Sequence, residues 1–137
     1  MAGGLSAFLW QNAKKIENVK YAVSPRFTDE ETGQAAMWEI RAVTAAKNAE
    51  IRRESIREAR GGAPAFDAET YLMRLCAECT VYPNLNDAAL QESYRVMGAP
   101  ALIGAMLTPA EFEAYCERVM EVNGFKTDAE MVDEAKN

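Results

Sequence analysis

Apolar residues follow two different periods along this chain, a period of two near the start and a helical period afterwards. In the first part, Val19, Tyr21 and Val23 alternate with polar or small residues, and residues 37–43 alternate in the same way. A period of two is typical of a strand with one buried face, and it places Trp38, Ile40 and Ala42 on that face of the second run. The polar stretch 28–33 between the two runs suits a hairpin tip, so the pattern predicts a two-stranded β-hairpin.

Such a hairpin needs support, because two strands alone are marginally stable in water. The ribbon must pack on the helices of its own chain, pair with another subunit, or become ordered on a partner. Pro25 cannot donate to a strand ladder and marks an edge or a bend. Ahead of the hairpin, a short N-terminal helix that begins at Ser6 or at the preceding glycines is predicted from the spacing of Leu5, Phe8, Leu9 and Asn12.

The helical period begins after the second run. Thr44 is placed to cap a helix that extends to about Arg60, and its thin apolar stripe consists of Ala45, Ala49 and Ile56, to which Ile51 can be added. Residues 61–64 are a break, and Asp67 caps the next helix. The apolar stripe of that helix consists of Tyr71, Leu72, Leu75, Cys76 and Cys79.

Four shorter segments complete the helical part. Residues 81–87 are predicted to be a turn in which Asn86 or Asp87 caps a helix carrying Leu90, Tyr94 and Met97. Residues 101–107 are apolar on almost every side, which is typical of the buried centre of a bundle. Residues 108–111 read as a capping box, and the helix that follows ends at residues 123–124. Thr127 caps a last short helix.

The expected fold is therefore α+β and mostly α, in a single domain that spans residues 1–137. Residues 1–43 form the N-terminal helix and the hairpin, and residues 44–137 form a bundle of about five to six short helices. A length of 137 residues, a mass of 15.1 kDa and an apolar fraction of 49% are enough for one ordinary core.

Charge and composition then exclude several classes of function. The formal net charge is −6, and it is divided into +2 for residues 1–60 and −8 for residues 61–137. Non-specific nucleic-acid binders carry a basic field, so that class is disfavoured. The absence of histidine excludes Ser-His and Cys-His catalysis and histidine metal sites. No apolar run is long enough to cross a membrane, and the first residues lack the features of a signal peptide, so we expect the protein to stay in the cytoplasm where it is made.

The sequence offers no catalytic constellation, metal site or cofactor site. Cys76 and Cys79 have CxxC spacing, but a zinc site needs four ligands and only Cys116 remains. Because this pair lies inside a helical pattern, we interpret both as small buried hydrophobes, with redox or metal use as the alternative. Glycine-rich phosphate loops are missing as well. The chain is best interpreted as a binding or interaction module.

Arginines are concentrated in the later turns of the helix predicted for residues 44–60. They are Arg52, Arg53, Arg57 and Arg60. Their simplest role is a solvated face with favourable charge near the helix C-terminus, and the alternative is a binding stripe for an acidic partner.

Several stretches of the sequence carry a family resemblance. They are residues 5–19, 38–44, 79–94, 96–99, 105–112, 123–125 and 134–137. In this order they resemble the XkdN-like tail assembly chaperones of phages and of defective, PBSX-type prophages of Gram-positive bacteria. The words YPNLND and, further on, MLTP are the most specific parts of the match. The hairpin tip at 28–36 and the loop at 60–66 do not share in it.

The resemblance implies a non-catalytic protein that is not retained in the virion. Such chaperones bind the long, helical tape measure protein, present it to tail tube protein and leave as the tube polymerises, without ATP. The implied partners are thus the tape measure and tail tube proteins, with no nucleic acid or membrane, and self-association stays open. The candidate client-binding residues are Tyr82, Leu85, Tyr94, Met97, Met106 and Phe112. The alternative for most of them is a place in the core, because apolar stripes at helical spacing usually face inward.

Two other functions stay open on the sequence. One is a structural tail or tube-associated component that remains in the particle, where the hairpin could extend a neighbour's sheet. The other is a small regulator that uses the arginine-rich helix on nucleic acid. The protein composition of purified particles tests the first, and a salt-sensitive shift of DNA mobility tests the second.

Overall fold

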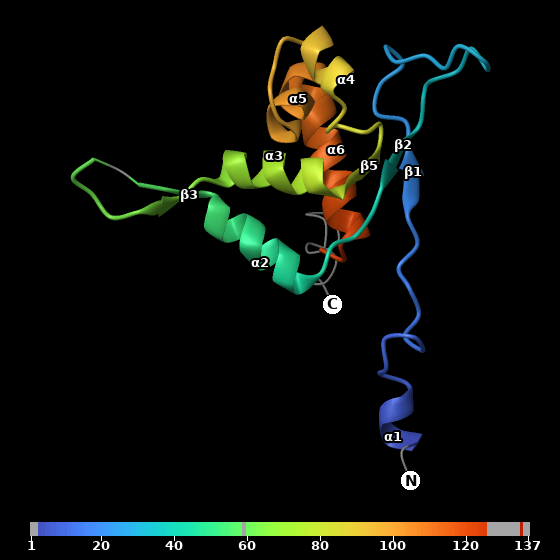
Figure 1. Cartoon of the computed structure of the whole chain (residues 1–137), viewed down its shortest axis with the longest axis vertical. Coiled ribbons are helices and arrows are strands. Elements are labelled where there is room, and N and C mark those ends of the chain that lie inside the picture. Colours follow the sequence, from blue (N-terminus) through green and yellow to red (C-terminus); the bar gives the residue numbers. More distant parts are fainter. Residues whose placement is uncertain (1–2, 59, 126–134, 136–137) are drawn as a thin grey trace.

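A three-stranded antiparallel sheet closes one end of a layer of helices (Figure 1). The computed structural model describes residues 3–58, 60–125 and 135. Strand β1 (Val19–Tyr21) pairs with β2 (Trp38–Ile40), and β2 pairs on its other side with β5 (Thr80–Tyr82). The predicted two-stranded hairpin is confirmed as β1 and β2, and β5, which was not predicted, adds a third strand to its sheet. The prediction of a turn from residue 81 was wrong for Val81 and Tyr82, which belong to β5.

The hairpin packs on the helices of its own chain. Alternation along β2 sends Trp38 and Ile40 into the core, where they are 2% and 0% exposed. The Trp38 ring meets the edge of the Tyr115 ring, with centroids 5.2 Å apart. The hydroxyl of Tyr115 lies 2.7 Å from that of Thr80, so one helix residue contacts both β2 and β5. Pairing with β5 covers one edge of β2 and packing covers one face, which answers the stability problem of an isolated ribbon.

Five helices follow β2 in the described part of the chain. They are α2 (Ala45–Glu54), α3 (Ala68–Cys79), α4 (Ala88–Ser93), α5 (Ala99–Met106) and α6 (Pro109–Val122). Four of them begin where the sequence predicts, since the side chains of Thr44, Asp67, Asp87 and Thr108 each accept a hydrogen bond from a backbone N–H three residues later. The capping box between Thr108 and Glu111 is complete.

Helix α3 is the centre of the helical layer and packs on α2, α5 and α6. A Cβ at Gly104 would lie 3.2 Å from Met73 Sδ and Cε, so the glycine allows α5 to approach α3 closely. Helix α5 was predicted to be buried all round. Its large residues Leu102 and Ile103 are buried, but Ala105 is exposed, because α5 lies on one side of the layer and turns its small residues outward.

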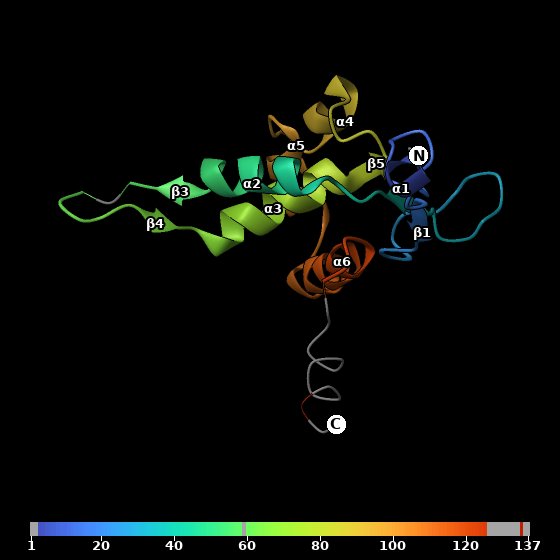
Figure 2. The ribbon, with the colours of Figure 1, turned by 90° about the horizontal axis from the view of Figure 1, so that it is seen from below.

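A short ribbon, β3 (Ile56–Arg57) and β4 (Ala65–Phe66), projects from the end opposite the sheet (Figures 1 and 2). The predicted extension of the preceding helix to Arg60 was therefore wrong, since α2 ends at Glu54. Ser55 ends it: its hydroxyl donates to the Ile51 carbonyl at 2.7 Å, and its own carbonyl accepts from the N–H of Asp67 at 2.8 Å. The break predicted at residues 61–64 is the connection between the two strands.

The predicted N-terminal helix is shorter in the structure, and the predicted C-terminal helix is not tested. Helix α1 (Gly3–Ser6) is a single turn, so Phe8 and Leu9 lie beyond it rather than on a helical face. The helix predicted from Thr127 lies outside the described residues. Within residues 3–58 and 60–125, no helix combines the length and the apolar character needed to cross a bilayer.

Arg26 ties the hairpin loop to the start of α6. Its Nη2 donates to Glu111 Oε1 at 2.5 Å and to the Met106 carbonyl at 2.9 Å, and its Nε donates to Glu111 Oε2 at 3.3 Å. The Arg26 guanidinium, with the Ser24 hydroxyl and the Thr108 backbone N–H, lowers the pKa of Glu111 from its ordinary 4.5 to about 2.

We expect the Glu111 contacts to make stability depend on pH in acid. Because the folded-state pKa lies below the unfolded one, their stabilisation is complete above pH 4.5 and is lost as the pH falls towards 2. Glu111→Gln should lower the melting temperature at neutral pH, and its deficit against the wild type should shrink over this acid range. Thermal unfolding followed by circular dichroism measures both. A deficit that does not change with pH would contradict the assignment.

Candidate functional site

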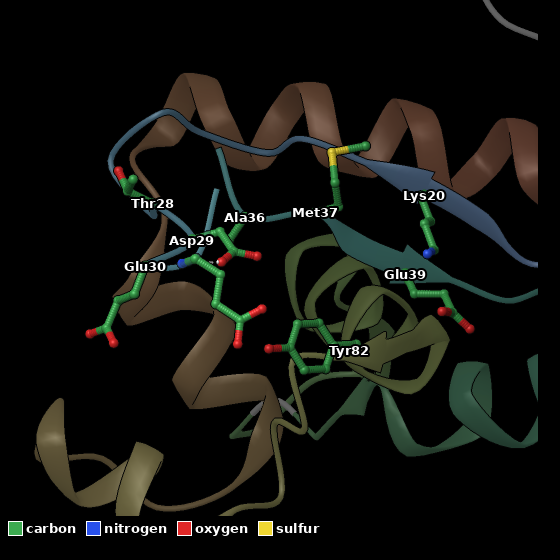
Figure 3. A pocket seen from close by; sticks show the side chains of 9 residues that line it. Lys20, Thr28, Asp29, Glu30, Ala36, Met37, Glu39 and Tyr82 are labelled. Carbon is green, nitrogen blue, oxygen red and sulfur yellow. Dashed lines mark hydrogen bonds between the residues drawn. The ribbon is translucent and has the colours of Figure 1, made fainter. Parts of the chain in front are cut away.

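The outer face of the sheet is the floor of an open groove (Figure 3). Lys20 lies opposite Glu39, and Glu39 lies opposite Tyr82, so one row of side chains crosses all three strands. These residues face away from the core, because Trp38 and Ile40 occupy the inner face of β2. Met37 precedes β2 and also lines the groove, with its side chain pointing away from the Tyr82 ring in Figure 3.

One wall of the groove is the tip of the β1–β2 hairpin. The Asp29 carboxylate accepts from the N–H of Glu31 at 2.8 Å, and the Asp29 carbonyl accepts from the N–H of Gly33 at 2.8 Å. Gly33 has a φ of +71°, a conformation that glycine adopts without strain. This turn directs Glu30 and Glu31 to solvent. The groove has a volume of about 690 Å³ and is lined by Lys20, Thr28, Asp29, Glu30, Glu31, Ala36, Met37, Glu39 and Tyr82.

Acidic residues surround an apolar centre in this groove. Four carboxylates and one lysine line it, which gives a formal charge of −3. The apolar centre is exposed, since Met37 retains 45% and Tyr82 61% of its accessible surface. The side-chain amide of Asn18 donates to Glu39 Oε2 at 2.8 Å and holds that carboxylate at the base. Such a surface suits a segment that carries both basic and apolar residues.

The cysteines offer no competing chemistry. Cys76, Cys79 and Cys116 are free and buried. A hydrogen bond to Cys116, at 3.3 Å between the sulfurs, and burial raise the pKa of Cys76, and burial raises the pKa of Cys79. Both stay protonated at neutral pH, whereas a metal ligand or nucleophile must be a thiolate. No cluster of metal-binding side chains occurs among the described residues either. The two side chains of the CxxC pair are buried, as expected for the small hydrophobes that the helical pattern indicated.

A family model decides the wider interpretation. The model of the phage XkdN-like tail assembly chaperone protein, TAC, matches residues 5–136. The chain belongs to this family of tail assembly chaperones. The resemblance read from the sequence is thus confirmed, and the family is a non-catalytic class of proteins.

Two relatives from Bacillus subtilis strain 168 span almost the whole chaperone. The uncharacterised protein YqbN is 28% identical over 136 residues, which are 96% of this chain and 91% of YqbN. The phage-like element PBSX protein XkdN is 26% identical over 139 residues, covering 97% of this chain and 93% of XkdN. The crystal structure of YqbN matches with a TM-score of 0.77 and 26% identity, over 89% of this chain and 97% of that one.

The six client-binding candidates occupy four kinds of place in the chaperone. Leu85 and Met106 are core residues, 2% and 5% exposed. Tyr94 and Phe112 are half-buried and pack against the core. Met97 is 91% exposed beyond α4. Only Tyr82 lines the groove.

The remaining groove residues were not among the candidates. Glu39 and Lys20 could have been placed on the outer face from the period-two pattern, because that pattern already assigns Trp38 and Ile40 to the inner one. The hairpin tip was recognised as a polar turn, but a polar turn has no functional signature of its own. Met37 and Tyr82 are far apart in the sequence, and they line the same groove because β5 pairs with β2.

Two of the arginines in the predicted basic stripe make contacts within the chaperone. The guanidinium of Arg52 lies 4.7 Å from the centre of the Phe66 ring, a cation–π contact that holds β4 against α2. Arg57 forms an ion pair with Asp67, the cap of α3. These two side chains stabilise the base of the β3–β4 ribbon. This role within the chain differs from both sequence interpretations, a solvated face and a binding stripe for an acidic partner.

Proposed function

We propose that this chaperone binds the tape measure protein of its phage or prophage and promotes polymerisation of the tail tube around it. The groove on the outer face of the sheet carries the proposal. It presents exposed Met37 and Tyr82 inside a rim of carboxylates, and so complements an amphipathic client helix with basic flanks.

In the proposed mechanism the chaperone buries apolar surface of the client and catalyses no reaction. A client helix that lies in the groove covers its own apolar stripe, and the net charge of −6 keeps the complex apart from other complexes. Tail tube protein then competes for the same client surface, and the chaperone is released rather than retained in the particle. The tail tube protein is accordingly the second proposed partner.

Co-expression tests this function. The tape measure protein of the same phage is produced alone, with the chaperone, and with the Tyr82→Asp variant, which places a charge at the centre of the groove. We expect the tape measure protein to be soluble and to co-purify only with the wild-type chaperone. Client that stays insoluble with wild-type chaperone would refute the proposal. A chaperone found at fixed stoichiometry in purified particles would support the structural-component alternative instead.

A further inference from the structure

The N-terminal segment 3–18 is an arm that leaves the body at β1 (Figures 1 and 2). Every residue from 4 to 18 is exposed. The arm is ordered by its own contacts: the Asn12 side-chain amide donates to the Ser6 carbonyl at 2.8 Å, and Lys15 Nζ donates to the Trp10 carbonyl at 2.6 Å. In the described part of the chain, Asn18 is the first residue with a side-chain hydrogen bond to the body.

This arm carries an unusual amount of exposed apolar surface. Its large apolar side chains, with their exposed fractions, are Leu5 (71%), Phe8 (79%), Leu9 (47%), Trp10 (78%) and Ile16 (69%). None of them belongs to the core cluster or packs against it, within the residues that the structure describes. A contiguous set of this size marks a protein interface, and tryptophan and phenylalanine are typical anchor residues of interfaces.

Charge indicates what the arm binds. The arm, residues 3–18, contains Lys14, Lys15 and one acidic residue, Glu17, so its formal charge is +1, and the rest of the chain carries −7. The groove alone carries −3 around Met37 and Tyr82. The arm is thus a basic and apolar segment, and the groove is the acidic and apolar surface of the same chain that complements it.

The arm and the groove of one copy point in different directions. The arm leaves the start of β1 and runs away from the body, whereas the acidic turn follows the end of β1 (Figure 1). The strand lies between them and is fixed by its pairing with β2. In two copies related by a two-fold axis, the arm of each copy can cover the groove of the other, because each copy supplies one arm and one groove.

We propose that two copies of this chain exchange their N-terminal arms, and that each arm lies in the sheet groove of the other copy. Phe8 and Trp10 cover Met37 and Tyr82, and Lys14 and Lys15 face the acidic turn. The exchange concerns the chaperone before it meets a client. Since the proposed function places the client in the same groove, client and arm compete, and binding of the client releases the exchanged arm.

Sedimentation of the purified full-length chain tests the exchange. We expect a dimer of twice the 15.1 kDa chain mass. Lys14→Glu with Lys15→Glu should weaken dimerisation at least about tenfold, and so should Glu30→Lys with Glu31→Lys. Mixing the two charge-reversed variants should restore a dimer, because the acidic arm of the first variant meets the basic turn of the second and the lysine arm of the second meets the acidic turn of the first.

The matched control reverses two carboxylates at the other end of the molecule, Glu58→Lys with Glu69→Lys, and should dimerise like the wild type. All of these positions are exposed, so unchanged melting temperatures show that the variants fold. A monomeric wild type, or a dimer that survives the arm reversal, would overturn the exchange. Solubilisation of tape measure protein by a monomeric arm variant would leave the proposed function intact, so that the two proposals can fail separately.

Discussion

Replacing Trp38 with alanine should remove a large part of the stability of the fold. Trp38 is 2% exposed and lies between the rings of Phe27 and Tyr115, at centroid distances of 6.1 and 5.2 Å. Truncating a buried tryptophan costs about 3–5 kcal/mol, and a domain of this kind has about 5–15 kcal/mol in total. We expect a melting temperature more than about 10 °C lower, measured by circular dichroism.

The second tryptophan of the chain provides the matched control. Trp10 is 78% exposed on the arm, so Trp10→Ala should change the stability of the isolated chain by no more than about 0.5 kcal/mol. Trp38→Phe keeps an aromatic ring against Tyr115 and should recover more than half of the loss. Equal effects of the two alanine variants would contradict the core described here.

Removing the apolar centre of the groove should greatly weaken client binding. Tyr82 and Met37 each gain about 1.5 kcal/mol or more when a client covers them. The double variant Tyr82→Ala with Met37→Ala should therefore weaken binding on the order of 100-fold. Because both side chains are exposed in the single folded chain, the variant should fold like the wild type, which its circular dichroism spectrum checks. Titration calorimetry with a soluble segment of the tape measure protein measures the affinity.

Ile56 supplies the control for this experiment. It is 51% exposed, between the values of Met37 and Tyr82, but it lies on the β3–β4 ribbon at the opposite end of the molecule. Ile56→Ala should leave the affinity unchanged. If Ile56→Ala weakens binding and the groove variant does not, the client site is on the ribbon, and the groove would serve another purpose.

Local signals made most of the helical part predictable. Thr44, Asp67, Asp87 and Thr108 each form their cap within three residues of sequence, so their effect does not depend on the rest of the fold. The period-two run at Trp38 and Ile40 likewise gave the inner face of β2, because pleating alone sends alternate side chains to opposite sides.

Elements that depend on distant residues were not predictable in the same way. Strand β5 is three residues long, and it exists because β2 offers an edge beside the end of α3. Ile56 fits the apolar side of a longer helix, and only the Ser55 hydrogen bonds to Ile51 and Asp67 turn it into a ribbon. Neither interaction has a signature within its own stretch of sequence.

The candidate site shows the same limit. Leu85, Met106 and Tyr82 looked alike as apolar candidates, two from the predicted turn and one from a helical segment, yet Leu85 and Met106 fill the core and Tyr82 lies on the surface. Spacing along one element reports that a residue is apolar and on a given side. Whether that side faces a helix, a groove or solvent depends on which neighbour packs there, and the neighbour is remote in sequence.

The direct passage from α3 into β5 has a mechanical consequence for the groove. Cys79 ends the helix and Thr80 begins the strand with no loop between them, and Thr80 is held by Cys76 and Tyr115 through its hydroxyl. The Tyr82 side is therefore rigidly continuous with the core, whereas the acidic side is a turn that is anchored at its base, by the Arg26 hydrogen bonds and by Phe27 against Trp38. If a long client lies in this groove as proposed, movement of the turn would let the groove accept stretches of different bulk.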